Sequence, residues 1–224
     1  MLEIARFINS RFSSNTYVIA HPEHDDVWIV DPGDTDPIFV WMDDYSKKSV
    51  SGILLTHAHF DHIYGVNEIL SHYPNCMVYI ANEYGKEALR NPKLNGSKYT
   101  DEGPIEFEKG TSLNEYTNDM LLWCDSPLRV LYTPGHSDDS VCLVVNGVIF
   151  TGDTLIKDVR TVTKLKGGSI EKLEDSVKVL SELKGNSLMV MPGHGDAFKL
   201  DEYDLAKVSN NPINNSVYAS NNEA

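Results

Sequence analysis

The sequence has only three cysteines, Cys76, Cys124 and Cys142, and none lies close to another. An odd number without close pairing is typical of reduced thiols and excludes the dense disulfide framework of small secreted proteins. The opening residues, MLEIARFINSRF, lack the long apolar segment of a secretion signal. We therefore expect a cytoplasmic protein.

Long apolar runs and an excess of basic residues are also missing. No apolar run approaches the roughly 18 residues that span a membrane. Lys plus Arg number 19 and Asp plus Glu number 33, which gives a formal net charge of −14. A chain this acidic repels phosphate backbones, and the short basic stretches at 47–48 and 164–166 do not offset that charge. We expect a small-molecule substrate, and neither nucleic acid nor a membrane as partner.

The remaining composition is that of an ordinary globular protein, with 41% hydrophobic and 23% charged residues in a chain of 224. No obvious linker divides the chain, so we expect one large domain over residues 1–208. The Asn- and Ser-rich tail at 209–224 is expected to be loosely ordered.

Apolar patterning predicts a mixed α/β (α+β) chain. Compact or alternating apolar runs predict strands at 15–20, 27–30, 52–56, 77–80, 128–132, 141–145, 148–150 and 188–190. Helical spacing predicts helices at 37–45, 63–72, 83–90 and 170–183. Residues 91–118 are polar and are predicted to form a long loop. A weak repeat of hairpin, helix, strand and histidine indicates two β-rich halves that face each other, with helices outside.

Candidate metal ligands follow four of the predicted strands. In chain order they are His57, His59, Asp61, His62, His136, Asp153 and His194. Strand ends that share one edge of a sheet bring their loops together. A single shared metal site would explain why four separate strands end in this way.

The spacing H-x-H-x-D-H in THAHFDH indicates two metal positions. His57 and His59, two residues apart in an extended loop, can chelate one ion, whereas Asp61 and His62 are turned toward a second position. Imidazole and carboxylate ligands suit zinc, and also iron or manganese. Two neighbouring ions need a bridging ligand, and a carboxylate such as Asp153 can bridge. Ions held in this way lower the pKa of water toward about 7 and polarise a carbonyl.

The other histidines are predicted to be surface residues, because His21 and His24 lie in a hairpin turn and His72 ends a helix. The cysteines join no motif and are predicted to be core or incidental residues. Asp31 follows a strand as Asp153 does. It either orients a ligand histidine or caps a turn.

The motifs THAHFDH, TPGHS, FTGDTL and PGHG, in this order, resemble those of the metallo-β-lactamase-fold hydrolases, and most closely the glyoxalase II-like (hydroxyacylglutathione hydrolase-like) branch. The resemblance covers nearly the whole chain. It implies the family's four-layer αββα sandwich, with metals at one edge of the two sheets. It also implies a dinuclear metal-dependent hydrolase of a small ester-like substrate, with a thioester favoured.

The resemblance further implies a role for each ligand. It divides them into a first metal site (His57, His59 and His136), a second metal site (Asp61, His62 and His194) and a bridge, Asp153. A metal-bound hydroxide would attack the carbonyl, and the metals, two divalent ions with zinc favoured, would stabilise the oxyanion. Asp61 would orient the nucleophile and is the predicted catalytic residue.

The sequence departs from this branch in places. Glyoxalase II proper has an additional C-terminal helical domain, whereas about 30 residues follow His194 here. HSDDS replaces the usual HSPGS at 136–140. Arg160 lies in DVRT, where many relatives carry Gly-Arg or Gly-Lys; it could meet an anionic substrate or pair with a surface acid. Tyr99 and Lys98, in the long loop, are candidates for the pocket wall.

Alternative functions remain within the superfamily. A persulfide dioxygenase would use a single iron, a lactonase would share all seven ligands, and a non-enzymatic relative would only bind metal. True zinc β-lactamases lack the aspartate that corresponds to Asp153. Flavodiiron oxygen reductases typically carry glutamate at the position of His59. RNA-processing nucleases tend to need nucleic-acid-binding segments, and this acidic chain shows none.

Overall fold

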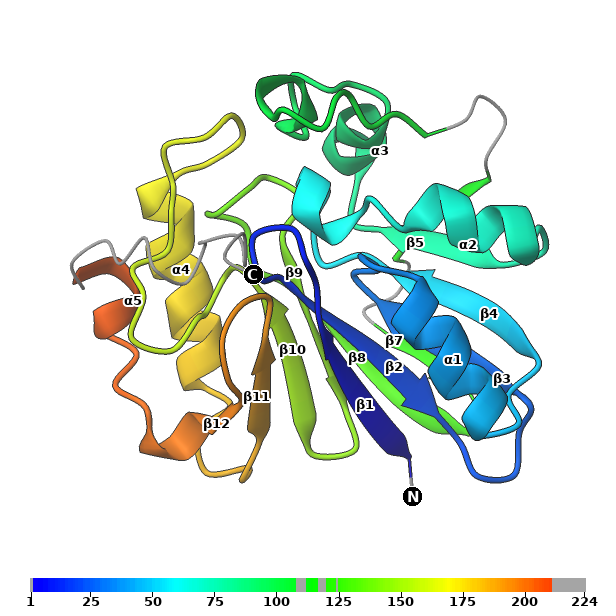
Figure 1. Ribbon diagram of the computed structural model, residues 1–224. Coiled ribbons are helices and arrows are strands. Elements are labelled where there is room, and N and C mark those ends of the chain that lie inside the picture. Colours follow the sequence, from blue (N-terminus) through cyan, green and yellow to red (C-terminus); the bar gives the residue numbers. More distant parts are fainter. Residues whose placement is uncertain (1, 108–111, 117–119, 124, 211–224) are drawn as a thin grey trace.

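Two facing sheets form the centre of the molecule (Figure 1). The computed structural model describes residues 2–107, 112–116, 120–123 and 125–210. The first sheet has the order β1-β2-β3-β4-β5-β6. Its strands are β1 (Glu3–Ile8), β2 (Asn15–Ala20), β3 (Asp26–Val30), β4 (Ser49–Leu54), β5 (Met77–Ile80) and β6 (Leu113–Glu115). The strands β3 to β6 run parallel to one another, so the carboxyl ends of β3, β4 and β5 meet at one edge.

The second sheet has the order β12-β11-β10-β9-β8-β7. Its strands are β7 (Met120–Trp123), β8 (Ser126–Tyr132), β9 (Val141–Val145), β10 (Val148–Gly152), β11 (Met189–Pro192) and β12 (Phe198–Lys199). The strands β8 and β10 both run antiparallel to β9, and β11 runs parallel to β10. The carboxyl ends of β8, β10 and β11 therefore also share one edge.

Helices cover the outer face of each sheet (Figure 1). The helices α1 (Asp36–Asp44), α2 (Val66–His72) and α3 (Glu83–Leu89) belong to the first half, and α4 (Ile170–Ser181) and α5 (Lys207–Asn210) to the second. Apolar clusters fill the spaces between the layers. Ile38 of α1 and Ile69 of α2 pack with Ile29 and Ile53 of the first sheet, and Leu173 and Leu180 of α4 pack with the second sheet.

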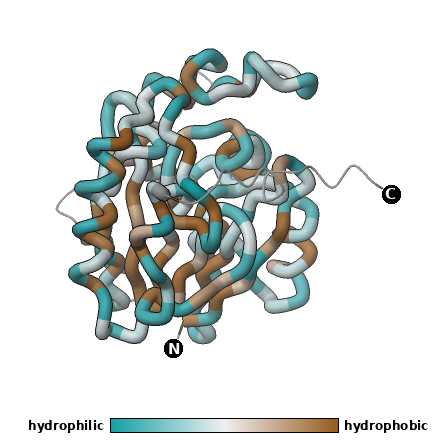
Figure 2. The backbone as a smooth tube through the Cα atoms, turned by 90° about the vertical axis from the view of Figure 1, so that its left-hand side faces the viewer, coloured by the Kyte–Doolittle hydropathy of each residue, from teal (hydrophilic) through white to brown (hydrophobic). Residues whose placement is uncertain are grey.

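A third apolar cluster lies between the two sheets, where Tyr17 and Trp28 of the first sheet meet Val130 and Phe150 of the second. Figure 2 shows the hydrophobic strands in the interior and hydrophilic segments toward the outside. Three clusters between four layers make an αββα sandwich, so the predicted fold class is confirmed.

The regular elements agree with most of the sequence prediction. The hairpin at Asn146-Gly147 forms, with both residues at positive φ (47° and 78°), the geometry that favours these two residue types. The helix predicted from residue 63 begins instead at Val66, because a single 3-10 turn at Phe60–His62 precedes it. The strand predicted at 52–56 extends over Ser49–Leu54.

Four strands were not predicted: β1, β6, β7 and β12. The loop predicted at 91–118 contains β6 and a 3-10 turn at Ser97–Tyr99. The helix α5 takes in the first two residues of the predicted tail, and the rest of 209–224 lies outside the described residues. The division into a 1–208 domain and a tail stays a prediction.

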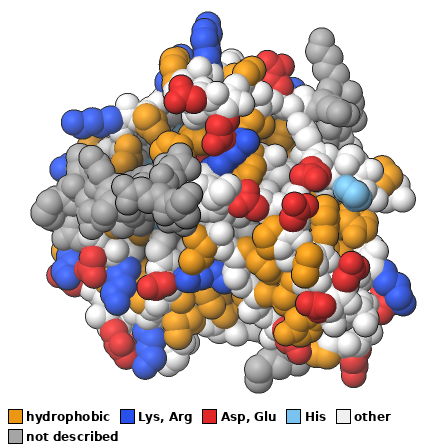
Figure 3. All heavy atoms as spheres, in the orientation of Figure 1, with side chains coloured by type: hydrophobic (Ala, Val, Ile, Leu, Met, Phe, Trp, Pro, Cys, Tyr) orange, Lys and Arg blue, Asp and Glu red, His pale blue; other side chains and the backbone are white. Residues whose placement is uncertain are grey.

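Charged side chains are spread over the surface. On the face shown in Figure 3, acidic and basic groups are interspersed with apolar ones. Within the described residues, no helix is long and apolar enough to cross a membrane.

Candidate metal centre

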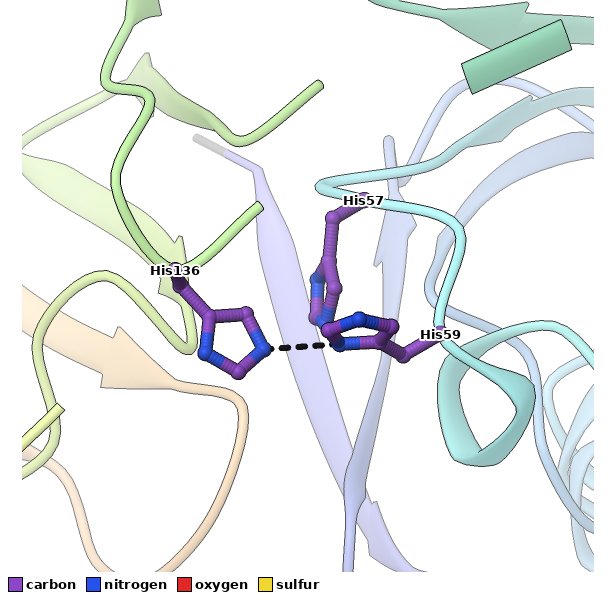
Figure 4. Close-up of side chains that lie close together, drawn as sticks. All are labelled: His57, His59 and His136. Atoms are coloured by element: carbon purple, nitrogen blue, oxygen red, sulfur yellow. Dashed lines mark hydrogen bonds between the residues drawn. The ribbon is translucent and has the colours of Figure 1, made fainter. Parts of the chain in front are cut away.

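All seven predicted ligands lie buried around one point at the shared edge of the sheets. Three of them, His57, His59 and His136, point toward one another from two loops, one after β4 and one after β8 (Figure 4). The facing nitrogens His59 Nδ1 and His136 Nε2 are 2.7 Å apart. A second group brings Asp61, His62 and His194 together. These two groups have the same members as the two ligand sets that the resemblance implied, and their role as metal ligands stays a prediction.

Asp153 lies between the two groups. Its Oδ1 is 3.5 Å from His62 Nε2 and its Oδ2 is 3.7 Å from His136 Nε2 and 3.5 Å from His194 Nε2. One carboxylate therefore faces nitrogens of both groups, as a bridging ligand must. Asp61 Oδ2 faces the second group, 3.2 Å from His194 Nε2 and 3.6 Å from His62 Nε2.

Four of the five imidazoles are held by a contact of Nδ1 with an oxygen. The acceptors are the Thr56 hydroxyl for His57, the Asp31 carboxylate for His62, the Val162 carbonyl for His136 and the Phe12 carbonyl for His194. Each contact places the proton on Nδ1 and leaves the Nε2 lone pair for the centre. Oxygen acceptors of this kind fix the tautomer and the ring orientation of metal-binding histidines.

Asp31 joins two of these contacts. Asp31 adopts a left-handed backbone conformation (φ 50°), which aspartate tolerates better than most residues. The Thr56 N–H and hydroxyl donate to its two oxygens at 2.7 and 2.6 Å, and His62 Nδ1 lies 3.1 Å from Oδ2. Because both oxygens have donors, we interpret Asp31 as a residue that orients His62 directly and His57 through Thr56.

Two glycines let the loops approach closely. A Cβ added to Gly193 would lie 2.3 Å from Asp153 Oδ1 and 2.8 Å from His62 Cε1. Gly152 has φ +46°, and a Cβ there would lie 2.3 Å from the Thr56 hydroxyl. These positions of the TGD and PGH motifs require glycine because the centre is packed against the backbone.

Burial and neighbouring charges shift the pKa values of the ligands. Burial lowers the pKa of His57 well below its ordinary value and lowers that of His59 to about 3, with the neighbouring imidazoles adding to the effect. These side chains are neutral at pH 7, the form that binds metal. Burial alone would lower the pKa of His62, but Asp61 and Asp153 outweigh it and raise that pKa to about 10. A cation at this position would replace the proton.

Unpartnered buried atoms test whether a metal fits. The Nε2 atoms of His57 and His62 and the Oδ1 of Asp153 are buried without a hydrogen-bond partner among the described residues. Buried polar atoms without partners are costly and rare. All three point to the centre, and imidazole with carboxylate is a donor set that Zn²⁺, iron and manganese accept. The residues present therefore fit a divalent metal.

The predicted surface histidines lie outside this centre. His24 and His72 are exposed and His21 is half-buried, and none belongs to a ligand cluster of the described residues. Cys76 and Cys142 are buried free thiols, as predicted, and Cys124 lies outside the described residues.

A cavity of about 400 Å³ opens from the centre to the surface. Of the predicted pocket residues, Tyr99 lines it, whereas Lys98 and Arg160 are not among its lining residues. Sequence reasoning missed Lys93, Lys164 and Lys166, which do line it. Their signal in the sequence was weak: one lysine in the long loop and a Lys-Leu-Lys stretch too short to mark a basic patch.

Comparisons with known proteins agree with the motif resemblance. The profile of the metallo-beta-lactamase superfamily matches residues 9–194. The hydroxyacylglutathione hydrolase of Francisella tularensis subsp. novicida (strain U112) is 30% identical over 190 residues, 84% of this chain and 65% of that protein. The hydroxyacylglutathione hydrolase of Idiomarina loihiensis is 31% identical over 194 residues, 86% of this chain and 63% of that protein. The chain thus spans less than two thirds of the length of these curated relatives.

Among solved structures, the crystal structure of BLEG-1 B3 metallo-beta-lactamase is similar to this chain, with a TM-score of 0.79 and 28% sequence identity. The match covers 88% of this chain and 94% of that one.

Proposed function

The chain belongs to the metallo-beta-lactamase superfamily, and from this premise we propose that it is a metal-dependent hydrolase of a small ester-like substrate, with a thioester as the favoured class. The observation that carries the proposal is the convergence of seven buried ligand residues on one point at the base of a cavity. The named activity of the relatives, hydroxyacylglutathione hydrolase, supports a thioester over other esters.

Two divalent ions, with zinc favoured, would occupy the centre. His57, His59 and His136 would hold one ion, Asp61, His62 and His194 the other, and Asp153 would bridge them. When bound, such ions act as Lewis acids that polarise a carbonyl and lower the pKa of water.

The residues of the chain would position the reactants. Asp61, Asp153, His59 and His136 all line the cavity, so a substrate carbonyl that enters it meets the ligands directly. Burial raises the pKa of Asp61, but His62 and His194 lower this pKa by more than burial raises it. The Asp61 carboxyl is therefore ionised at neutral pH. We assign Asp61 the role of hydrogen-bond acceptor that orients the attacking water. In the overall reaction, water adds to the thioester carbonyl, the C–S bond breaks, and an acid and a thiol are released.

The thiols of the protein support a proposal about its cellular location. Two buried cysteines are free, which supports a reducing, cytoplasmic location over an oxidising one. We also retain the proposal that residues 1–208 form one domain.

The test combines metal analysis with a substrate panel. We expect two divalent ions per chain and turnover of thioesters above lactones, phosphodiesters and β-lactams. Preferred turnover of a lactone would change the proposed substrate class from thioester to lactone, but the protein would still be a hydrolase. One iron per chain with oxygen uptake on a persulfide would overturn the proposal in favour of a dioxygenase. Tight metal binding with no turnover of any panel member would favour a non-enzymatic role.

A further inference from the structure

The cavity changes character from its buried end to its mouth. At the buried end lie the candidate ligands His59, Asp61, His136 and Asp153. Apolar side chains then line the walls: Phe12, Phe60, Leu94, Val162 and Leu165. The rings of Phe12 and Phe60 meet edge to face with their centroids 5.1 Å apart. A volume of about 400 Å³ is within the range of small-molecule sites.

Several of the apolar side chains near the mouth are open to solvent. Tyr99 is 73% exposed, Leu165 is 53% exposed and Phe12 is 38% exposed. All three line the same cavity, although they come from three separate segments of the chain. Exposed apolar side chains gathered around one opening are typical of a binding site for an apolar group.

Three lysines line the mouth of the same cavity. Lys93 follows α3, and Lys164 and Lys166 lie between β10 and α4; all three are exposed. None of them forms an ion pair with a described residue. Elsewhere six lysines do pair with carboxylates: Lys48, Lys86, Lys172, Lys178, Lys199 and Lys207. In a chain with 33 acidic residues, three unpaired lysines at one opening form a local positive potential that attracts anions.

We propose that this pocket selects an amphipathic thioester that carries an anionic group. Its carbonyl would reach the buried candidate ligands, its body would be apolar, and its outer end would carry the anion. The apolar body would pack against Phe12, Phe60 and Leu165, and the anion would meet Lys93, Lys164 and Lys166. This inference rests on the proposed hydrolase function. It differs from a preference for a polar peptide thiol, because the walls offer apolar surface where such a thiol would need hydrogen-bond partners.

The first experiment uses three thioesters with the same acyl group. The thiols are a mercaptoalkanoate, the mercaptoalkanol of equal length, and glutathione. The first is apolar with a terminal anion, the second is apolar and neutral, and the third is anionic but polar. We expect kcat/KM for the mercaptoalkanoate ester to exceed that of the alkanol ester by about tenfold, chiefly through KM, because charge pairing of this kind acts on binding.

The second experiment removes the charges. The triple variant K93Q/K164Q/K166Q is expected to lose that tenfold preference, because its kcat/KM for the mercaptoalkanoate ester falls to that for the alkanol ester. Lys98→Gln is the matched control, since Lys98 is exposed in the same loop as Lys93 but does not line the cavity. Raising the salt concentration should shrink the preference of the wild type and of the control variant, but not of the triple variant.

Different outcomes contradict different parts of the proposal. Equal kcat/KM for the anionic and neutral apolar esters would overturn the role of the lysines. A higher kcat/KM for the acylglutathione would overturn the apolar body. If no thioester turns over, the proposed function fails, and calorimetry with the thioether analogue of the mercaptoalkanoate ester still tests the pocket. Equal affinity of this analogue for the wild type and the triple variant would then refute the inference by itself.

Discussion

The histidines of the centre are oriented by oxygen atoms from distant parts of the chain. The Phe12 carbonyl holds His194, and the Val162 carbonyl holds His136. Neither oxygen is part of a sequence motif, because any residue offers a carbonyl. The motifs therefore identify the candidate ligands, but the atoms that fix the tautomers of these histidines become visible only in the folded chain.

Asp153 is the residue whose loss should affect both metal positions. Asp153→Ala removes a carboxylate that lies between the two ligand groups and faces nitrogens of both. We expect the metal content to fall below two ions per chain and kcat/KM to fall by roughly a hundredfold or more. Elemental analysis and steady-state kinetics measure both effects.

His72→Ala serves as the control for that experiment. His72 is exposed at the end of α2 and contacts the Phe39 ring rather than the centre. The metal content of the His72→Ala variant should equal that of the wild type. A loss of metal in this variant would show that the histidines were divided wrongly, and near-normal turnover of Asp153→Ala would refute the bridge.

Asp139 carries an unusual buried charge. It occupies the position of the glycine in the usual HSPGS motif, and its Oδ2 is buried without a hydrogen-bond partner among the described residues. Burial raises its pKa to about 6, although Ser137 and the Ala58 N–H donate to the carboxylate. Because the folded-state pKa lies above the unfolded value of 3.8, the folded state loses stability as the pH rises through this window.

Asp139→Asn should therefore stabilise the metal-free protein at pH 7 by roughly 1–3 kcal/mol and have little effect near pH 4. Chemical denaturation at both pH values measures the change. The neighbouring Asp138→Asn is the control, because Asp138 is partly exposed and pairs with Lys172; it should change stability by less than about 1 kcal/mol. A destabilised Asp139→Asn at pH 7 would mean that the charge makes a favourable contact in the fold.

The helix α4 supports the loop that carries His136. The Ser169 N–H donates to the Gly135 carbonyl at 2.9 Å, and the Ser176 hydroxyl donates to the Pro134 carbonyl at 2.7 Å. A Cβ on Gly135 would lie 2.5 Å from the Leu173 backbone. The helix thus contacts the backbone of the TPGH motif directly, and this contact explains why a glycine precedes the histidine.

Removing one of these contacts should weaken the loop without removing a ligand. Ser176→Ala leaves the partly buried Pro134 carbonyl without its donor, so we expect a loss of about 1 kcal/mol in the free energy of unfolding. Ser181→Ala, on the exposed side of the same helix, loses only a bond to the Lys178 carbonyl one turn earlier and should change stability by less than about 0.5 kcal/mol. Equal losses in the two variants would contradict the supporting role of Ser176.

Elements with a single strong pattern were predictable from the sequence, and those that depend on neighbours were not. The apolar run of β2 is buried throughout, and the Asn146-Gly147 turn has its own conformational preference. By contrast, β1 lies at the sheet edge with a half-exposed, mixed pattern, and β6 has only three residues. Such strands form because a neighbouring strand offers hydrogen bonds, which no local pattern reveals.

The site shows the same division. The convergence of the seven candidate ligands was predictable because each follows a strand in a compact motif. The three lysines of the cavity mouth were not, because two loops far apart in the sequence meet there only in the fold.

The centre joins the two halves of the molecule. His57, His59, Asp61 and His62 follow β4 of the first sheet, whereas His136, Asp153 and His194 follow strands of the second. Bound metal would therefore link the sheets, and chelation should lower the stability of the whole protein. At a free metal concentration a hundred times the Kd, the linkage contributes about 2.7 kcal/mol.

The shifted pKa values of the histidines predict how the stability of the metal-free protein depends on pH. The folded-state pKa values of His57, His59 and His136 lie below the ordinary value of 6.5, because burial disfavours the charged form. Their contribution to stability is present above pH 6.5 and is lost as the pH falls, by up to about 1.4 kcal/mol per pH unit for each group. His62 has a raised pKa, so its contribution to stability is not lost as the pH falls below 6.5.

Denaturation curves at pH 7, 6 and 5, with and without metal, test both expectations. We expect the metal-free protein to be less stable at each pH and to weaken on acidification, since the three histidines outweigh the opposite effects of Asp139, His62 and His194, whose pKa values are raised. The loaded protein should weaken more steeply, because protons compete with the metal. Stability that is independent of chelator at pH 7 would contradict a metal that links the sheets.

The order of the ligands along the chain also bears on how the protein would be made in the cell. During synthesis the segment 57–62 leaves the ribosome well before His136, Asp153 and His194 have been added. A cation that met this early segment would find at most four of the seven groups, without a bridge. Occupation of both metal positions would then have to wait until the second half of the chain has been added.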